Sequence, residues 1–338
     1  MAFINPNLEA KYYHCEGDNV VCDLCPHRCV IPPEKFGRCR SRKNVDGKLV
    51  AYNYGRISTM AVDPIEKKPF YHFHPGTNIL SVGGIGCNLR CNYCQNYSIS
   101  QSPIGKKRTT YKSPADLVAF CKQQNYTQMA FTYNEPSIWY EYIRDTMDIA
   151  PDLDIAIVTN GMINEEPLKE LCKGAAAMNI DVKAFNQDFY RDLCGGGDLE
   201  AVKRSCEIVY ASKVHLELTY LVIPGFNDTV DEVLKFVKWA KDHLSPDIPI
   251  HFTRFHPDYN MMDVRMTPVD TLLKLQKVAE DNGMNYVYVG NAMTDDGSNT
   301  YCPGCGEQVI RRTGYRVQIS ALNGNRCEYC GHRLNIIR

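Results

Sequence analysis

The sequence predicts an α/β protein built on a partial (β/α)6 barrel of the TIM type, with an N-terminal cysteine-rich lobe and a C-terminal zinc ribbon. From about residue 79, short apolar runs rich in β-branched residues alternate with longer helical stretches, a pattern typical of βαβ units and a parallel sheet. Cysteines gather at both ends of the chain, outside this alternation. About six crossover units in one direction favour an incomplete barrel over a doubly wound sheet. The periodicity of the sequence alone does not exclude the doubly wound sheet. We expect three parts, residues 1–75, 76–295 and 296–338.

The bulk composition is that of an ordinary globular chain. Its 338 residues, 44% of them hydrophobic and 23% charged, are enough to bury a large core. The net charge of −1 gives no general attraction to nucleic acid or anionic membranes. The first residues lack a basic segment followed by an apolar one, and nowhere do about 18 apolar residues run together. We therefore expect a cytoplasmic protein without membrane or nucleic-acid partners.

The expected elements follow the alternation of the pattern. Strands are expected at 79–82, 129–133, 155–159, 178–182, 214–222, 250–255 and 286–289. Helices are expected near 114–124, 137–148, 166–173, 198–210, 229–243 and 268–282. Three of these helices carry start signals, namely Ser113 before Pro114, Asp198 before Leu199 and Thr267 before Pro268.

The chain has 16 cysteines and no recognisable export signal, which indicates metals and redox chemistry rather than disulfides. Three of them, Cys87-x3-Cys91-x2-Cys94, follow the first expected strand. Three thiolates on a 4Fe-4S cubane leave one iron open. An open iron can take the amino and carboxylate groups of S-adenosylmethionine (SAM), which an electron from the cluster then cleaves to a radical. Five other cysteines have no ligand spacing and are expected to be packed thiols: Cys15, Cys121, Cys172, Cys194 and Cys206.

Polar residues mark the ends of the expected strands. In α/β barrels, reacting groups gather where strands end and loops begin. Carboxylates there would suit the SAM amine and sugar, and a cation would suit its carboxylate. The residues expected to surround SAM on this basis are Glu135, Asn160, Asp181, Lys183 and His256.

Two matched cysteine pairs lie near the C-terminus, Cys302-x2-Cys305 and Cys327-x2-Cys330. This spacing indicates tetrahedral zinc held by four thiolates, with a mononuclear iron site as the minor alternative. Short strands are expected near 309–310 and 315–317, so residues 300–338 should form a zinc ribbon.

The N-terminal set is less decisive. Either zinc or a second cluster suits the set Cys22, Cys25, Cys29 and Cys39. Zinc is slightly favoured because a small proline-rich lobe needs a structural metal to be stable. Residues 48–75 are expected to form a hairpin followed by the Asp63-Pro-Ile-Glu-Lys-Lys-Pro segment. The alternating His72 and His74, which follow that segment, are interpreted as strand side chains rather than ligands.

The Cys87-Asn-Leu-Arg-Cys91-Asn-Tyr93-Cys94 segment resembles the cluster motif of the radical SAM superfamily, in which the aromatic before the last cysteine lies near adenine. Tyr93 takes that role by resemblance. Over about 79–290 the chain is similar to pyruvate formate-lyase activating enzymes, whose Gly-Gly-Glu-Pro stretch corresponds to Tyr133-Asn134-Glu135-Pro136. Asp181-Val-Lys183 and His256 also match SAM-binding segments of that family. Its cation-binding acidic residue is replaced by Val158, so no cation site is expected.

The whole chain most resembles the radical SAM enzymes of the AmmeMemoRadiSam system, through the Cys22-Asp-Leu-Cys25-Pro-His-Arg-Cys29 lobe and the Asp63–Pro69 segment. That resemblance implies AMMECR-type and Memo-type partners. The family chemistry implies a low-potential electron donor of the ferredoxin or flavodoxin type, anaerobic conditions and hydrogen abstraction by a 5′-deoxyadenosyl radical. Two alternatives remain: an activase of glycyl-radical enzymes, and a non-catalytic multi-metal interaction or RNA-binding protein, against which the neutral charge argues.

Overall fold

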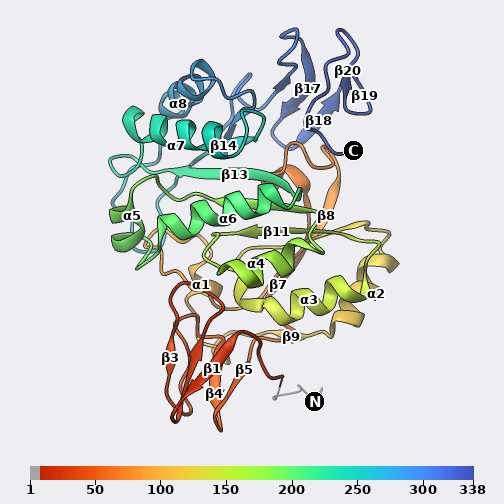
Figure 1. Ribbon diagram of the computed structural model, residues 1–338. Helices are drawn as coiled ribbons and strands as arrows, with labels where there is room; N and C mark the ends of the chain where they lie inside the picture. The colour runs from red at the N-terminus through yellow and green to blue at the C-terminus, as the bar shows by residue number, and fades with distance from the viewer. Residues whose placement is uncertain (1–7) are drawn as a thin grey trace.

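The computed structural model describes residues 8–338 and has an eight-stranded sheet at its centre (Figure 1). Residues 1–7, which carry most of the segment searched for an export signal, lie outside the described residues. The strands run in the order β15-β14-β13-β12-β11-β10-β8-β7. They span β7 Thr59–Pro64, β8 Asn78–Gly83, β10 Gln128–Phe131, β11 Asp154–Thr159, β12 Ala177–Asp181, β13 His215–Val222, β14 Ile250–Arg254 and β15 Val287–Gly290.

All neighbours in this sheet are parallel except the antiparallel pair β7 and β8. From β8 to β15 each strand pairs with the next strand of the sheet along the chain, so the order never reverses as it does in a doubly wound fold. The predicted α/β fold with a mainly parallel sheet is confirmed. Within the described chain, β7 and β15 are the two edges, and the barrel is therefore open.

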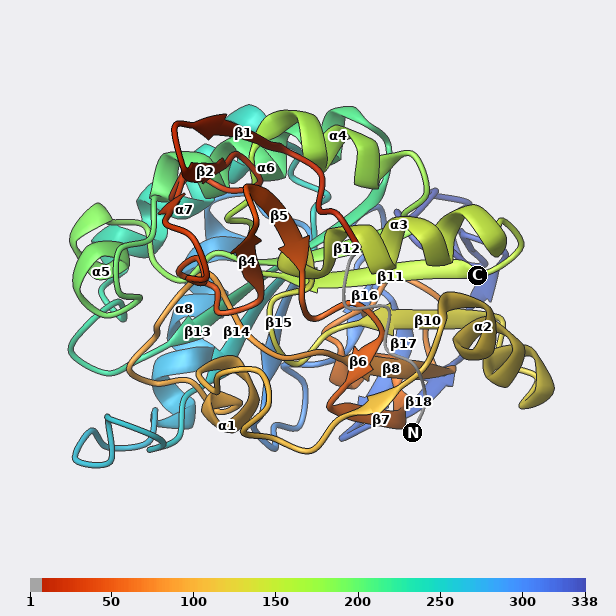
Figure 2. The same ribbon diagram turned by 90° about the horizontal axis from the view of Figure 1, so that it is seen from below.

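A helix follows each of the parallel strands except β15. These helices are α2 Pro114–Gln123, α3 Tyr140–Ile149 after the 3-10 turn η2 Pro136–Trp139, α4 Glu165–Cys172, α5 Gln187–Asp192 with α6 Leu199–Ala211, α7 Val230–His243 and α8 Val269–Asp281. Seen from below, they form an arc around the outside of the sheet (Figure 2). Among residues 8–338, no helix combines the length and the apolar character needed to cross a bilayer.

Two of the three predicted start signals cap their helices. The Ser113 side chain accepts a hydrogen bond from Asp116 N at the start of α2, and Asp198 accepts one from Ala201 N at the start of α6. Thr267 does not cap α8, because its hydroxyl donates to Val222 O, 2.6 Å away. The Thr267 hydroxyl therefore bonds the end of β13 instead of the first turn of α8.

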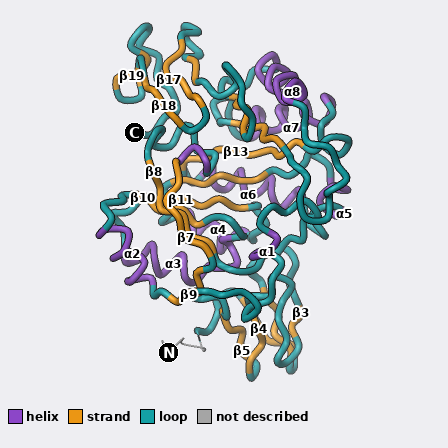
Figure 3. The backbone as a smooth tube through the Cα atoms, turned by 180° about the vertical axis from the view of Figure 1, so that it is seen from behind, coloured by secondary structure: helices purple, strands orange, loops and turns teal. Residues whose placement is uncertain are grey.

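The N-terminal lobe and the ribbon lie at opposite ends of the molecule (Figures 1 and 3). The lobe contains β1 Tyr13–Glu16, β2 Asn19–Cys22, β3 Val30–Ile31, β4 Arg42–Val45 and β5 Lys48–Ala51. The short β6 Arg56–Ile57 pairs with β9 Thr110–Tyr111. The ribbon contains β16 Thr300–Tyr301, β17 Gln308–Thr313, β18 Arg316–Ile319, β19 Leu322–Asn323 and β20 Arg326–Cys327.

The expected hairpin over 48–75 is wrong. β5 pairs back with β4, while β7 leaves the lobe and adds antiparallel to β8 at the edge of the central sheet. The 3-10 turn η1 Ile65–Lys67 follows β7 and begins the connection from β7 to β8. Residues 59–75 thus pack with the barrel rather than with the cysteine-rich lobe.

Candidate active site and metal centres

A cavity of about 520 Å³ opens at the carboxyl ends of the parallel strands and runs down into the barrel. The residues that line it come from the cysteine loop after β8 and from the ends of successive strands. They include Cys87, Cys91, Tyr93, Cys94, Asn134, Glu135, Asn160, Asp181 and Lys183. The structure thus brings together all but one of the residues that the sequence assigns to the cluster and to SAM. The exception is His256, an exposed residue absent from this lining.

The cysteine loop is tightly anchored between β8 and the helix α1 Tyr97–Ser100. Gly86 has a φ of 94°, and a Cβ there would lie 2.4 Å from Cys39 O, so only glycine fits. Further along, Arg90 N donates to Cys194 O and Asn92 N to Leu193 O, both at 2.9 Å. The loop therefore packs against both the N-terminal lobe and the segment after α5.

The thiol environment fits an iron–sulfur cluster. Burial raises the pKa of Cys87 and of Cys94, so both thiols stay protonated unless a metal binds. The pKa of Cys91 is lowered, first by a contact with Cys194 and then, against burial, by Lys183. Soft thiolates are the donors that iron–sulfur clusters take. Cys87, Cys91 and Cys94 are the only cysteines among the described residues that line the cavity. They would hold three irons of a 4Fe-4S cubane and leave the fourth iron without a cysteine ligand.

Cys194, the packed thiol nearest this loop, lies outside the cavity. It is fully buried, and its sulfur lies 3.1 Å from the Tyr93 hydroxyl. The residues that line the cavity do not include Cys194, so it contacts Cys91 and Tyr93 on their side away from the cavity.

Asn134 and Glu135 hold the site together through the backbone. The Asn134 side chain accepts from Gly84 N and donates to Gly86 O, both at 2.9 Å. The Glu135 carboxylate, 1% exposed, accepts from Ser137 N, from the Thr159 hydroxyl and from Asn160 N at 2.6–2.9 Å. Burial raises the pKa of Glu135, and these donors oppose the rise. Both side chains therefore fix the cysteine loop and the end of β11 relative to each other.

Asn160 connects the end of β11 to the first cysteine. Its amide nitrogen donates to Asn88 Oδ1 at 2.9 Å and lies 3.6 Å from the Cys87 sulfur, while its Oδ1 accepts from Met162 N at 2.9 Å. An N–H group directed at a ligand sulfur stabilises negative charge there.

Asp181 and Lys183 form an ion pair just beyond β12. Burial disfavours the charged ammonium, but the negative charges of Asp181 and of the Cys91 thiolate outweigh it, so the pKa of Lys183 is raised. Lys183 therefore presents a permanent positive charge to the cavity, next to the cysteine loop.

The cavity also has residues that sequence reasoning missed. Glu66, Lys68, Thr219, His251 and Thr253 also line it. Thr219 and Leu221 on β13, like His251 and Thr253 on β14, are two residues apart and so face the barrel interior together. Polar residues at every second position of an otherwise apolar strand were the signal that could have found them.

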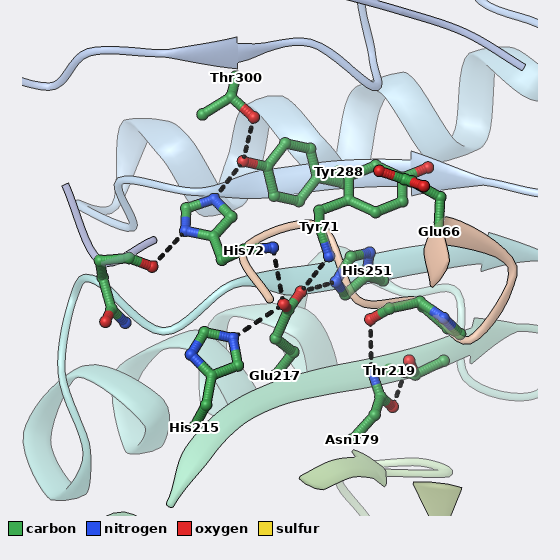
Figure 4. A network of polar contacts seen from close by, with 12 residues as sticks. Glu66, Tyr71, His72, Asn179, His215, Glu217, Thr219, His251, Tyr288 and Thr300 are labelled. Carbon is green, nitrogen blue, oxygen red and sulfur yellow. Dashed lines mark hydrogen bonds and ion pairs between the residues drawn. The ribbon is translucent and has the colours of Figure 1, made fainter. Parts of the chain in front are cut away.

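A buried network closes the floor beneath these residues (Figure 4). Glu217, fully buried on β13, accepts from His72 N and His215 Nε2 through one oxygen, and from Tyr71 N and His251 Nε2 through the other, at 2.6–3.0 Å. The expectation that His72 and His74 are strand side chains is wrong, because neither lies in a strand. Their rings bond other protein groups: His72 is 2.6 Å from the Tyr288 hydroxyl, and His74 bonds Asp154.

The ribbon gathers the four C-terminal cysteines. Their sulfurs lie within 4.8 Å of one another, with Cys302–Cys330 at 3.6 Å and Cys305–Cys327 at 3.7 Å. These separations are far longer than a disulfide bond. The N-terminal cysteines Cys22, Cys25, Cys29 and Cys39 line a separate small cavity next to the cysteine loop.

An open parallel barrel with a three-cysteine loop at the mouth of its cavity defines the class of this protein. Residues 82–240 match the family model of the radical SAM superfamily, and the chain belongs to that superfamily. Membership implies a 4Fe-4S cluster, SAM and a reductant.

Two curated relatives and one solved structure illustrate the range of similarity. The chain is 39% identical to the uncharacterized protein MJ0808 of Methanocaldococcus jannaschii, over 97% of this chain and 99% of that protein. It is 27% identical to a GTP 3′,8-cyclase of Lactiplantibacillus plantarum, over 68% of this chain and 74% of the cyclase. A radical SAM methyltransferase from Sphaerobacter thermophilus shares the fold, with a TM-score of 0.52, 15% identity and coverage of 64% and 67%.

Proposed function

We propose that this protein cleaves SAM reductively at a 4Fe-4S cluster held by Cys87, Cys91 and Cys94 and abstracts hydrogen from a substrate bound deeper in the same cavity. The observation that carries the proposal is the placement of these three thiols on a cavity that polar residues from the strand ends also line. When bound, the cluster and SAM supply one-electron cleavage of the sulfonium to methionine and a 5′-deoxyadenosyl radical.

The chain's own residues would orient SAM. Lys183 is suited to the methionine carboxylate and Asp181 to the amine or ribose, since both face the cavity beside the cysteine loop. Tyr93 belongs to the cysteine loop and lines the cavity, so it could take the position near adenine that the resemblance assigns to it. Glu135, Asn134 and Asn160 contribute by fixing the loop, because their polar atoms already bond the backbone and each other. Contact between His256 and SAM stays a prediction, and requires the loop after β14 to bring that exposed side chain inward.

The same proposal includes the remaining expectations from the sequence. A ferredoxin-type or flavodoxin-type donor supplies the electron, and AMMECR-type and Memo-type proteins are the proposed partners. The reaction belongs in an anaerobic cytoplasm, where 16 free cysteines stay reduced.

Zinc is the metal we propose for the ribbon. Four thiolates about 2.3 Å from one ion stand about 3.8 Å apart at the corners of a tetrahedron. The measured sulfur separations of 3.6 and 3.7 Å are close to that edge length. The ion would stabilise a lobe whose core is small.

The test is formation of 5′-deoxyadenosine. Protein purified and reconstituted without oxygen is incubated with SAM and dithionite, and the nucleoside is quantified by chromatography. Wild type should form it, Cys91→Ala should not, and Cys15→Ala should behave as wild type because Cys15 is exposed and does not line the cavity. A wild-type protein that carries a reduced cluster yet forms no 5′-deoxyadenosine would contradict the proposal.

A further inference from the structure

The four N-terminal cysteines surround one buried space. Cys22 ends β2, Cys25 and Cys29 lie in the connection to β3, and Cys39 precedes β4, yet all four line a single cavity of about 10 Å³. That volume is roughly what one water-sized sphere needs. Four thiolates drawn to about 2.3 Å around a zinc ion leave no such space between them.

The ribbon provides an internal comparison for these distances. There, four cysteine sulfurs all lie within 4.8 Å of one another, the separation that a single ion demands. Within residues 8–338, the ribbon set is the one group of cysteine, histidine or carboxylate ligands gathered that closely. The N-terminal set stays wider, as the three cluster cysteines of the barrel do. Wider spacing is expected where different irons of one cluster take the thiolates.

A second observation concerns Arg42, which lines the same cavity. Its side chain is 1% exposed, and it pairs with Glu141 through Nη2 and with Lys11 O through Nη1. Its Nε–H has no hydrogen-bond partner among the described residues. A buried donor without an acceptor is costly, by about 1–3 kcal/mol. The sulfides of an iron–sulfur cluster accept N–H hydrogen bonds, whereas a zinc ion brings no acceptor of its own.

The cavity directly adjoins the cysteine loop of the barrel. Asn88, the residue after Cys87, lines it, and its carbonyl lies 2.8 Å from His27 Nε2 and accepts from Arg38 Nε at 3.3 Å. From the other side, Gly86 packs against Cys39 O so closely that a Cβ would not fit. The N-terminal cavity and the cluster cysteine Cys87 are therefore joined through the neighbouring residues Gly86 and Asn88.

We propose that Cys22, Cys25, Cys29 and Cys39 bind a second iron–sulfur cluster, which exchanges electrons with the cluster of Cys87, Cys91 and Cys94. In each exchange one electron leaves one cluster and enters the other, and no atom is transferred. The low-potential donor that reduces the protein is the source of that electron. The exchange rests on the proposed function, but the metal assignment does not.

The metal assignment is tested without any turnover. The triple variant Cys87→Ala/Cys91→Ala/Cys94→Ala is purified and reconstituted with iron and sulfide in the absence of oxygen. Iron, acid-labile sulfide and zinc are counted, and spin resonance is recorded after reduction with dithionite. We expect retained iron and sulfide, about one zinc per chain from the ribbon, and a cluster signal. About two zincs per chain and no sulfide would overturn the assignment.

A second variant locates the signal. Adding Cys22→Ser and Cys39→Ser to the triple variant should remove the iron and the signal, while the ribbon zinc and the far-UV circular dichroism report that the chain still folds. Iron that survives these changes would overturn the site. In the reduced wild type, neighbouring clusters couple magnetically, so its spectrum should differ from the sum of the two single-cluster spectra. A purely additive spectrum would overturn the exchange.

Discussion

The Glu217→Gln substitution tests whether the buried floor network holds the segment at residues 71–72 against strand β13 of the barrel. The wild-type carboxylate accepts four hydrogen bonds, two from backbone amides and two from histidines. A glutamine keeps the shape but replaces one acceptor oxygen with an NH2 group. Whichever way the amide turns, one backbone N–H, of Tyr71 or His72, faces a donor. We expect a loss of about 2–5 kcal/mol, from one stranded buried donor at about 1–3 kcal/mol and from the weakening of charged bonds to neutral ones.

The pH dependence gives a second and independent reading. Burial raises the pKa of Glu217, but the hydrogen bonds from His215 and His251 outweigh burial and leave this pKa well below its usual range. A carboxyl whose folded pKa is depressed contributes stability above its unfolded pKa of about 4.3, and that contribution is lost as the pH falls further. The free energy gap between wild type and Glu217→Gln should therefore be widest near neutrality and narrow below about pH 4.3.

Urea unfolding under anaerobic conditions, followed by circular dichroism from pH 7 downward, measures both effects. Glu166→Gln is the matched control, because that side chain is 76% exposed and a surface change of this kind stays within about 0.5 kcal/mol. A Glu217→Gln protein as stable as this control would refute the reasoning, and so would a gap that stays constant with pH.

Three further outcomes follow from the site. Gly86→Ala should block cluster assembly, measured as iron per chain, because its Cβ would meet Cys39 O at 2.4 Å; Gly105→Ala, with the same φ of 94° and open space around it, isolates the backbone strain and should retain iron. Lys183→Met should weaken SAM binding by about 10–100-fold in calorimetry, as expected for about 1.4–2.8 kcal/mol, with unchanged affinity counting against its role. Cys305→Ser, at an exposed sulfur, should release the ribbon zinc and open that lobe to protease, and retained zinc would contradict the four-thiolate site.

The sequence was informative where spacing or strand ends carry the chemistry. Cysteine spacing marked all three sets of cysteines that the structure gathers, and strand ends placed Asp181 and Lys183 on the cavity. Neither rule could reach Glu66 and Lys68, because β7 and the turn after it join the sheet antiparallel, outside the βαβ pattern. Strand ends also placed His256 at the mouth, yet a loop residue after a strand is free to turn outward, as this one does.

The two ends of the cavity depend on different parts of the chain. Its mouth is set by the cysteine loop, which packs on the N-terminal lobe through Gly86. Residues of the floor network and Tyr315 of the ribbon also line the cavity, and His72 of that network bonds Asn335 O at 2.8 Å. On the proposed function, the N-terminal lobe supports the part of the cavity where SAM and the cluster would bind, and the ribbon borders the part left for a substrate. Damage to the ribbon should accordingly impair substrate binding and preserve the cluster content. Damage to the N-terminal lobe should lower the cluster content and preserve substrate binding.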